Sequence, residues 1–290
     1  MERANRRPAL GPFVQWPRDE RAHADDEELD MIVVAQSPAT TTSGASVFDE
    51  IAATHQQDAS EYRLITQPDH ARLSGVIATA LDRDKLPYVS DEIVRGIANH
   101  DIGWSQVDGL APDPILPPLG ADGRLRSFLN TPPEIFLNAW KRSIVSAAEI
   151  GASAGTMVSE HFERLAIFRL QRSQDTSEDV ARLNQFVAEE KYRQHQMKVS
   201  LTAQNSKRLL TLLQLCDIVS LYVCCGLRRD RVLEQDLGFG PVEIGSSKES
   251  TWLGGVPLRS EVRTTCPAFR WRRGTSQLLQ ESIDVHLRPA

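Results

Sequence analysis

The spacing of apolar residues predicts helices through the first half of the chain. After Pro68, apolar residues recur at positions 73, 77 and 81, which predicts a helix with Asp69 as its N-cap and with His70 on the apolar face. A second helix is expected from Ser90. It carries apolar residues at 93, 94 and 97 inward before the chain reaches His100 and Asp101. Three to four residue spacing therefore puts these three polar residues on apolar helix faces.

Helical patterns also continue from residue 131 to residue 225. "TPPE" (131–134) predicts a helix start capped by Thr131, and a further helix carries His161 among apolar neighbours. The charged segment 177–198 has a thin apolar stripe, typical of a surface helix. The segment from about 206 to 225 is the most apolar and contains Asp217. A central aspartate disfavours a membrane span, so we interpret this segment as a buried core helix.

The two ends of the chain are less regular. Residues 1–30 have the composition of a disordered tail, and "MIVVAQ" (31–36) and "YRLITQ" (62–67) predict a short N-terminal β-hairpin. Residues 227–290 show only weak strand signals. We therefore expect a mainly α fold: a helical bundle over 31–226 with that hairpin, followed by a poorly defined C-terminal tail, an irregular extension over 227–290.

Charge and cysteine usage narrow the expected partners. The 290-residue chain has 39 acidic and 33 basic residues, a net charge of -6, which argues against binding to nucleic acid or to an anionic membrane. "RWRRG" (270–274) is too short a basic cluster to change this. The four cysteines show no C-x-x-C spacing and the N-terminus has no signal-peptide core, so we expect a cytoplasmic protein that binds a small-molecule substrate.

Five polar residues on apolar helix faces suggest a metal site. They are His70, His100, Asp101, His161 and Asp217. A buried carboxylate needs a cation or strong donors to replace its hydration, and one shared metal ion would serve all five. Imidazole and carboxylate together favour Mn, Fe or Zn over Mg. Each residue alone also has a structural interpretation: a histidine bonded to backbone, a helix cap, or an aspartate paired with an arginine.

Four sequence stretches carry a resemblance to a known family. "LITQPDHARLSG" (64–75), "HDIGW" (100–104), "VSEHF" (158–162) and "CDIVSLYVC" (216–224) closely resemble the family called domain of unknown function 3891, over roughly residues 31–226. The order His, His-Asp, Asp is also similar to the HD superfamily of metal-dependent phosphohydrolases, which are all-helical. This second likeness would make the expected fold an HD-like bundle.

The HD likeness implies roles for particular residues. It makes His70, His100, Asp101 and Asp217 metal ligands, and it puts His161 where two-metal members have additional histidines. Two positions depart from the resemblance. Ile102 stands where an acidic residue is frequent, and "CPAF" (266–269) replaces a "PWPF"-like ending.

Two hypotheses about function follow. The first is a metal-dependent hydrolase of a small phosphate ester, in which Asp101 orients the attacking water and Arg164, one helical turn after His161, contacts the phosphate or is simply a surface residue. The second is a non-catalytic helical module that binds a ligand or partner, with the same polar residues forming a buried hydrogen-bonded network. The absence of a Gly-rich loop or a tight Lys/Arg cluster motivates the second hypothesis.

Overall fold

The computed structural model describes residues 32–35, 47–56, 59–106, 119, 125–172, 175–197, 201–247 and 249–290. The expected tail at 1–30 therefore lies outside the described residues, as does the loop expected from its prolines at 109–120, except for residue 119. The elements are β1 (Ile32–Ala35), α1 (Val47–Gln56), β2 (Glu61–Ile65), α2 (Gln67–Thr79), α3 (Asp91–Ala98), the 3-10 helix η1 (Ile102–Gln106), α4 (Pro133–Ile150), α5 (Ala152–Arg172), α6 (Ser177–Gln196), α7 (Ala203–Cys224), β3 (Arg231–Leu233), β4 (Val242–Ser246), β5 (Thr251–Gly254), β6 (Val262–Arg272) and β7 (Leu278–Pro289).

The expectation of a mainly α bundle with a poorly defined C-terminal tail is wrong. The described residues form a seven-stranded sheet in the order β1-β2-β6-β7-β5-β4-β3, and five of those strands come from the segment after α7. The two N-terminal strands do pair antiparallel, with Ile32 opposite Ile65. They are nevertheless the end of a larger sheet, because β2 also pairs with β6 near residue 270.

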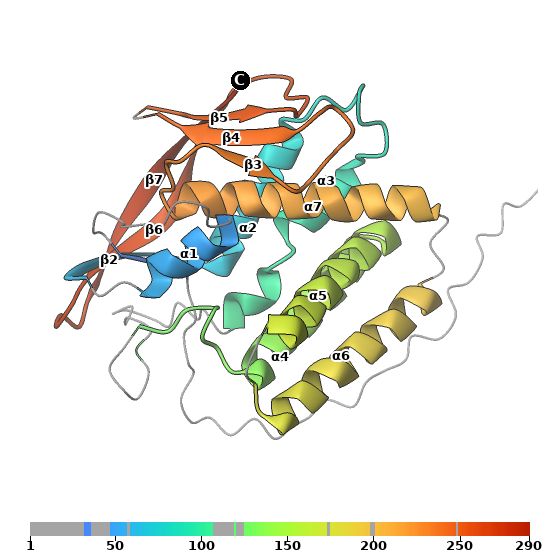
Figure 1. Ribbon diagram of the computed structural model, residues 1–290, viewed down its shortest axis with the longest axis horizontal. Coiled ribbons are helices and arrows are strands. Elements are labelled where there is room, and N and C mark those ends of the chain that lie inside the picture. The colour runs from blue at the N-terminus through green and yellow to red at the C-terminus, as the bar shows by residue number, and fades with distance from the viewer. Residues whose placement is uncertain are drawn as a thin grey trace, which may run out of the picture.

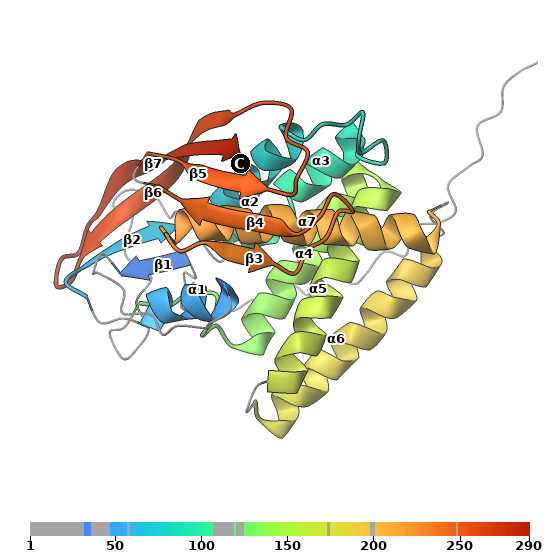
Figure 2. The ribbon, with the colours of Figure 1, turned by 45° about the horizontal axis from the view of Figure 1, so that its top comes forward.

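Helix α7 lies between the sheet and the other long helices. Figures 1 and 2 show β3, β4 and β5 on one side of it, and α4, α5 and α6 on the other. One continuous core joins the two sides, since Leu212 and Tyr222 of α7 belong to the same buried cluster as Phe162 of α5 and Ile244 of β4. The apolar character of segment 206–225 is thus explained by burial on both sides. No helix in the described part of the chain is both long and apolar enough to cross a membrane.

Two of the expected helix starts differ in detail. The N-cap of α2 is Thr66, whose hydroxyl accepts a hydrogen bond from the Asp69 backbone N–H, so Asp69 lies inside the first turn. Helix α4 begins at Pro133 without a side-chain cap, because the Thr131 hydroxyl donates to the Ser127 carbonyl instead. Ser90 caps α3 as expected.

The N-terminus of α5 is capped from another helix. Oε1 of Glu92, in the first turn of α3, accepts hydrogen bonds from the backbone N–H groups of Ser153 (2.8 Å) and Ala154 (3.0 Å). The carboxylate therefore accepts from two backbone N–H groups that have no partner within the helix. Its negative charge also interacts favourably with the positive end of the helix dipole. Glu92 consequently joins the helix that leads to His100 to the helix that carries His161.

Replacing Glu92 with alanine should lower the free energy of unfolding by about 1 kcal/mol, as loss of a helix cap does. Urea denaturation followed by circular dichroism measures the change. Glu92→Gln is the matched control, because its amide oxygen can still accept from α5 and should lose less. Equal stability of the alanine variant and the unchanged protein would contradict the capping role.

Candidate metal centre

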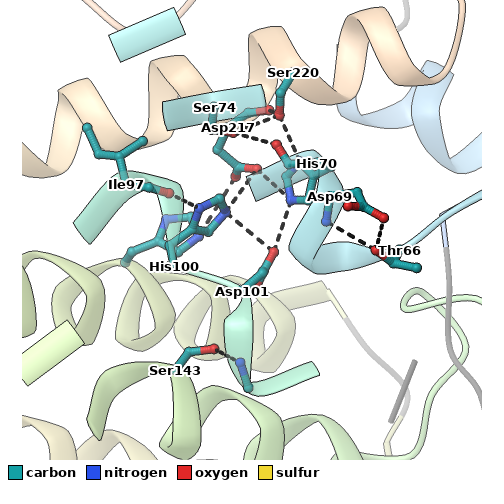
Figure 3. Close-up of polar contacts among 12 residues, drawn as sticks. Thr66, Asp69, His70, Ser74, Ile97, His100, Asp101, Ser143, Asp217 and Ser220 are labelled. Carbon is teal, nitrogen blue, oxygen red and sulfur yellow. Dashed lines mark hydrogen bonds and ion pairs between the residues drawn. The ribbon is translucent and has the colours of Figure 1, made fainter. Parts of the chain in front are cut away.

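Four elements bring the expected site residues together. His70 lies in the first turn of α2, His100 and Asp101 lie in the turn between α3 and η1, and Asp217 lies in the middle of α7. Figure 3 shows these side chains pointing toward one another from the surrounding helices. His161, on α5, borders the group, with its ring 5.7 Å from the ring of His100.

The distances describe a tight cluster of ligand atoms. Nε2 of His70 lies 3.0 Å from Asp101 Oδ2 and 3.6 Å from Asp217 Oδ1. Nε2 of His100 lies 3.4 Å and 3.6 Å from the same two atoms. Ligand atoms of His70, His100 and Asp217 all fall within 4.8 Å of one another, so this group could hold a metal ion. His161 Nε2 is 3.8 Å from Asp217 Oδ2.

The tautomer of His100 follows from its backbone partner. Its Nδ1 lies 2.7 Å from the carbonyl oxygen of Ile97, and a carbonyl can only accept, so Nδ1 carries a proton. In the neutral ring, Nε2 then presents a lone pair toward the carboxylates. This Nε2 is buried and has no hydrogen-bond partner among the described residues, and the same holds for His161 Nδ1. Unpartnered buried polar atoms of this kind are expected where an ion binds.

Burial and charge have opposite effects on the pKa values in the cluster. Burial lowers the pKa of His100, but Asp101 and Asp217 outweigh it and leave the pKa well above its usual value. For Asp101 and Asp217, burial raises the pKa, but the neighbouring imidazoles outweigh it and hold both carboxylates below their usual range. Both aspartates are therefore ionised at neutral pH. Burial lowers the pKa of His161 to about 4, with Asp217 offsetting part of the effect, so this ring is neutral.

Access to the cluster is from the carboxylate side. The side chains of His70 and His100 are each 1% exposed, whereas those of Asp101 and Asp217 are 11% and 17% exposed. The imidazoles thus form the floor of the site. Arg164 lies on the exposed face of α5, where its charge acts on Glu160, and its expected contact with substrate stays a prediction.

A close helix contact fixes the turn that carries His100 and Asp101. The backbone N–H of Gly103 donates to the Ser143 hydroxyl of α4 at 2.9 Å. A Cβ atom at Gly103 would lie 2.0 Å from the Ala139 carbonyl oxygen, a distance that no side chain can adopt. Only glycine lets the turn lie directly against α4, and this contact sets the position of Asp101 two residues earlier.

The sequence interpretation missed the groups that surround the ligands. They are the Ile97 carbonyl oxygen and the hydroxyls of Ser74 and Ser220. A signal for the serines was present: Ser74 follows His70 by one helical turn, and Ser220 is one of the few polar residues in the apolar segment of α7. Small hydroxyl residues one turn from a candidate ligand are therefore useful indicators of supporting hydrogen bonds.

Comparison with known proteins gives a family but no activity. The model of the family described as Protein of unknown function (DUF3891) matches residues 54–252. No curated protein and no solved structure matches the chain. The matched range includes every residue of the cluster and extends past α7 into β5. The likeness to the HD superfamily is not supported by these comparisons and stays a prediction.

Proposed function

Because the chain belongs to the DUF3891 family, whose function is unknown, we propose a function from the site itself: a metal-dependent hydrolase of a small phosphate ester. In this proposal, His70, His100, Asp101 and Asp217 hold a divalent ion, and His161 lies at its border. The mixed imidazole and carboxylate ligands favour Mn, Fe or Zn over Mg.

One observation carries the proposal: imidazole nitrogens and carboxylate oxygens from different helices converge in a buried site. His100 uses its Nδ1 proton on the Ile97 carbonyl, and its unpartnered Nε2 faces two ionised carboxylates. When the His100 ring is neutral, these acceptors face one another away from water and repel, and each lacks the hydration it had in the unfolded chain. A divalent cation at their centre removes both costs. It also balances the charge of Asp101 and Asp217.

A protonated network without metal is the second candidate, and the high pKa of His100 favours it. A proton on Nε2 of His100 would pair with the carboxylates and satisfy the cluster without an ion. The sequence also allowed an arginine as the partner of Asp217. In the described part of the chain, the ion-pair partners of Asp217 are instead imidazoles. Metal binding therefore distinguishes an ion-bound site from this protonated network, and hydrolysis by the metal-bound protein distinguishes an enzyme from a non-catalytic ligand-binding or partner-binding protein.

The chain's own groups suit hydrolysis in this arrangement. A bound ion would lower the pKa of a coordinated water to about 7 and would polarise a phosphoryl oxygen. Asp101 and Asp217 are more exposed than the imidazoles, at 11% and 17% of their side chains, and Asp101 could accept a hydrogen bond from the attacking water and orient it. The buried imidazoles of His70 and His100 exclude water from the opposite side.

The proposal is tested by metal analysis of the purified protein, followed by a phosphomonoesterase and phosphodiesterase screen with Mn²⁺, Fe²⁺ and Zn²⁺. We expect a stoichiometric bound metal, and hydrolysis that is lost with a chelator and restored by the ion. Failure to retain or bind any of these metals would overturn the metal site. Metal binding without hydrolysis of any phosphate ester would overturn the catalytic part and favour the binding protein.

A further inference from the structure

Ser220 joins two of the proposed ligands through a single hydroxyl. It lies on α7, one turn after Asp217, and is completely buried. Its Oγ is 2.7 Å from His70 Nδ1, 2.8 Å from the Asp217 carbonyl oxygen and 2.8 Å from the Ser74 hydroxyl. Figure 3 shows Ser220 on the side of His70 away from Asp101. Ser220 therefore contacts the outer nitrogen of His70 and lies outside the centre of the cluster, where an ion would bind.

The hydrogen-bonding capacity of the Ser220 hydroxyl favours one tautomer of His70, the one with its proton on Nδ1. A hydroxyl has one proton to donate and two lone pairs that accept. The Asp217 carbonyl can only accept, so it takes the Ser220 proton. The Ser74 hydroxyl donates to Ser220, which is nearer to it than the His70 carbonyl at 3.2 Å. The remaining lone pair of Ser220 can accept a proton from His70 Nδ1, and this tautomer leaves the Nε2 lone pair free for an ion; in the other tautomer, Nε2 donates to Asp101 Oδ2, 3.0 Å away.

We propose that Ser220 is a positioning residue that accepts the Nδ1 proton of His70 and so holds the Nε2 lone pair toward the metal ion. The inference rests on the proposed metal site. Ser220 does for His70 what the Ile97 carbonyl does for His100. In metal sites, a ligating histidine regularly donates its other ring N–H in this way, which fixes the ring and makes the ligand more basic.

The same hydroxyl also fixes the distance between two helices at the site. His70 and Ser74 belong to α2 and Ser220 belongs to α7, so two of the three hydrogen bonds of Ser220 join the helices, and the third, to the Asp217 carbonyl, lies within α7. Without an acceptor for the Nδ1 proton, the other tautomer of His70 becomes accessible, in which Nε2 carries the proton and donates it to Asp101, 3.0 Å away. That alternative pairing occupies the nitrogen that the metal needs.

The test compares Zn²⁺ affinity and the His70 ring in variants at Ser220. Ser220→Ala should weaken Zn²⁺ binding by about 10- to 100-fold, the usual cost of losing an outer hydrogen bond to a ligand. With metal removed and at alkaline pH, the ¹⁵N shifts of the His70 ring should show Nδ1 protonated in the unchanged protein and a mixture of tautomers in the alanine variant. Ser159→Ala is the matched control, because Ser159 is equally buried but bonds to Glu190.

The outcomes separate this inference from the proposed function. If the unchanged protein does not bind Zn²⁺ or another of the proposed ions, the metal site itself is wrong. If it binds and Ser220→Ala binds as tightly, with His70 in the same tautomer, the positioning role alone is wrong. Should the alanine variant fail to fold, Ser220→Cys keeps the volume but has a weaker acceptor, and it must still lower the affinity. Unchanged affinity in the cysteine variant would then overturn the role.

Discussion

The variant His100→Ala is expected to lose stoichiometric divalent metal and, with it, any phosphate-ester hydrolysis. His100 supplies a buried Nε2 that faces both carboxylates, and no neighbouring group in the described part of the chain donates to it. Alanine removes a direct ligand, so the loss of affinity should exceed the about 10- to 100-fold that outer hydrogen bonds contribute. Isothermal titration of the metal-free protein with Zn²⁺ measures it.

Thermal unfolding gives a second measure of the same loss. A ligand at about 100 times its Kd stabilises the protein to which it binds by about 2.7 kcal/mol. Added metal should therefore raise the Tm of the unchanged protein and leave that of His100→Ala unchanged. His195→Ala is the matched control, because His195 is exposed on α6 and has no role in the cluster. Equal metal content in the two variants would rule out His100 as a ligand.

Gly103→Ala is expected to destabilise the protein and to displace Asp101. The added methyl group would meet backbone atoms of α4, the Ala139 oxygen at 2.0 Å and the Ser143 nitrogen at 2.7 Å, and backbone cannot move aside as a flexible side chain can. Overpacking of this kind costs about 1 to 3 kcal/mol, and here at least the upper part of that range is expected. The turn must move away from α4 or α4 must shift.

Denaturant unfolding and Zn²⁺ titration together test this expectation. Stability and metal affinity should fall together in Gly103→Ala, since the turn that moves also carries His100 and Asp101. Gly254→Ala is the control, because the nearest atom to its new Cβ is the terminal Ala290 methyl carbon at 3.3 Å. A Gly103 variant as stable as this control, with unchanged affinity, would show that the turn can adapt.

The helical part of the fold was predictable because its signals are local. Apolar spacing of three to four residues predicted the helices from α2 to α7 but missed α1. It also put His70, His161 and Asp217 on inward faces, and for this reason a single metal site could be proposed for all three. Which atoms meet was not predictable. The contact of Ser220 with His70 depends on how α2 and α7 pack, and nothing in either helix alone specifies it.

The sheet escaped prediction because the alternation in its longest strand is interrupted. In β6, burial alternates up to Cys266 and Ala268, which face the main core, and then changes face, so that Phe269 and Trp271 face a second apolar cluster on the other side. A change of face breaks the period of two that marks a half-buried strand. Pro267 further weakens the strand signal of β6 in the sequence. It is tolerated because the pairing of β6 with β2 covers only residues 269–272, so the missing N–H costs no bond to β2.

The pairing of β2 with β6 also constrains when the protein can fold. Tyr62 lies opposite Trp271, so this part of the sheet closes a loop of about two hundred residues, and such long-range closure is slow compared with helix formation. While the protein is being synthesised, the helices can form early, but β2 must keep one edge unpaired until residues 262–272 have left the ribosome. An open edge strand can pair with other chains. A nascent chain stalled after α7 should therefore depend on chaperones and aggregate without them.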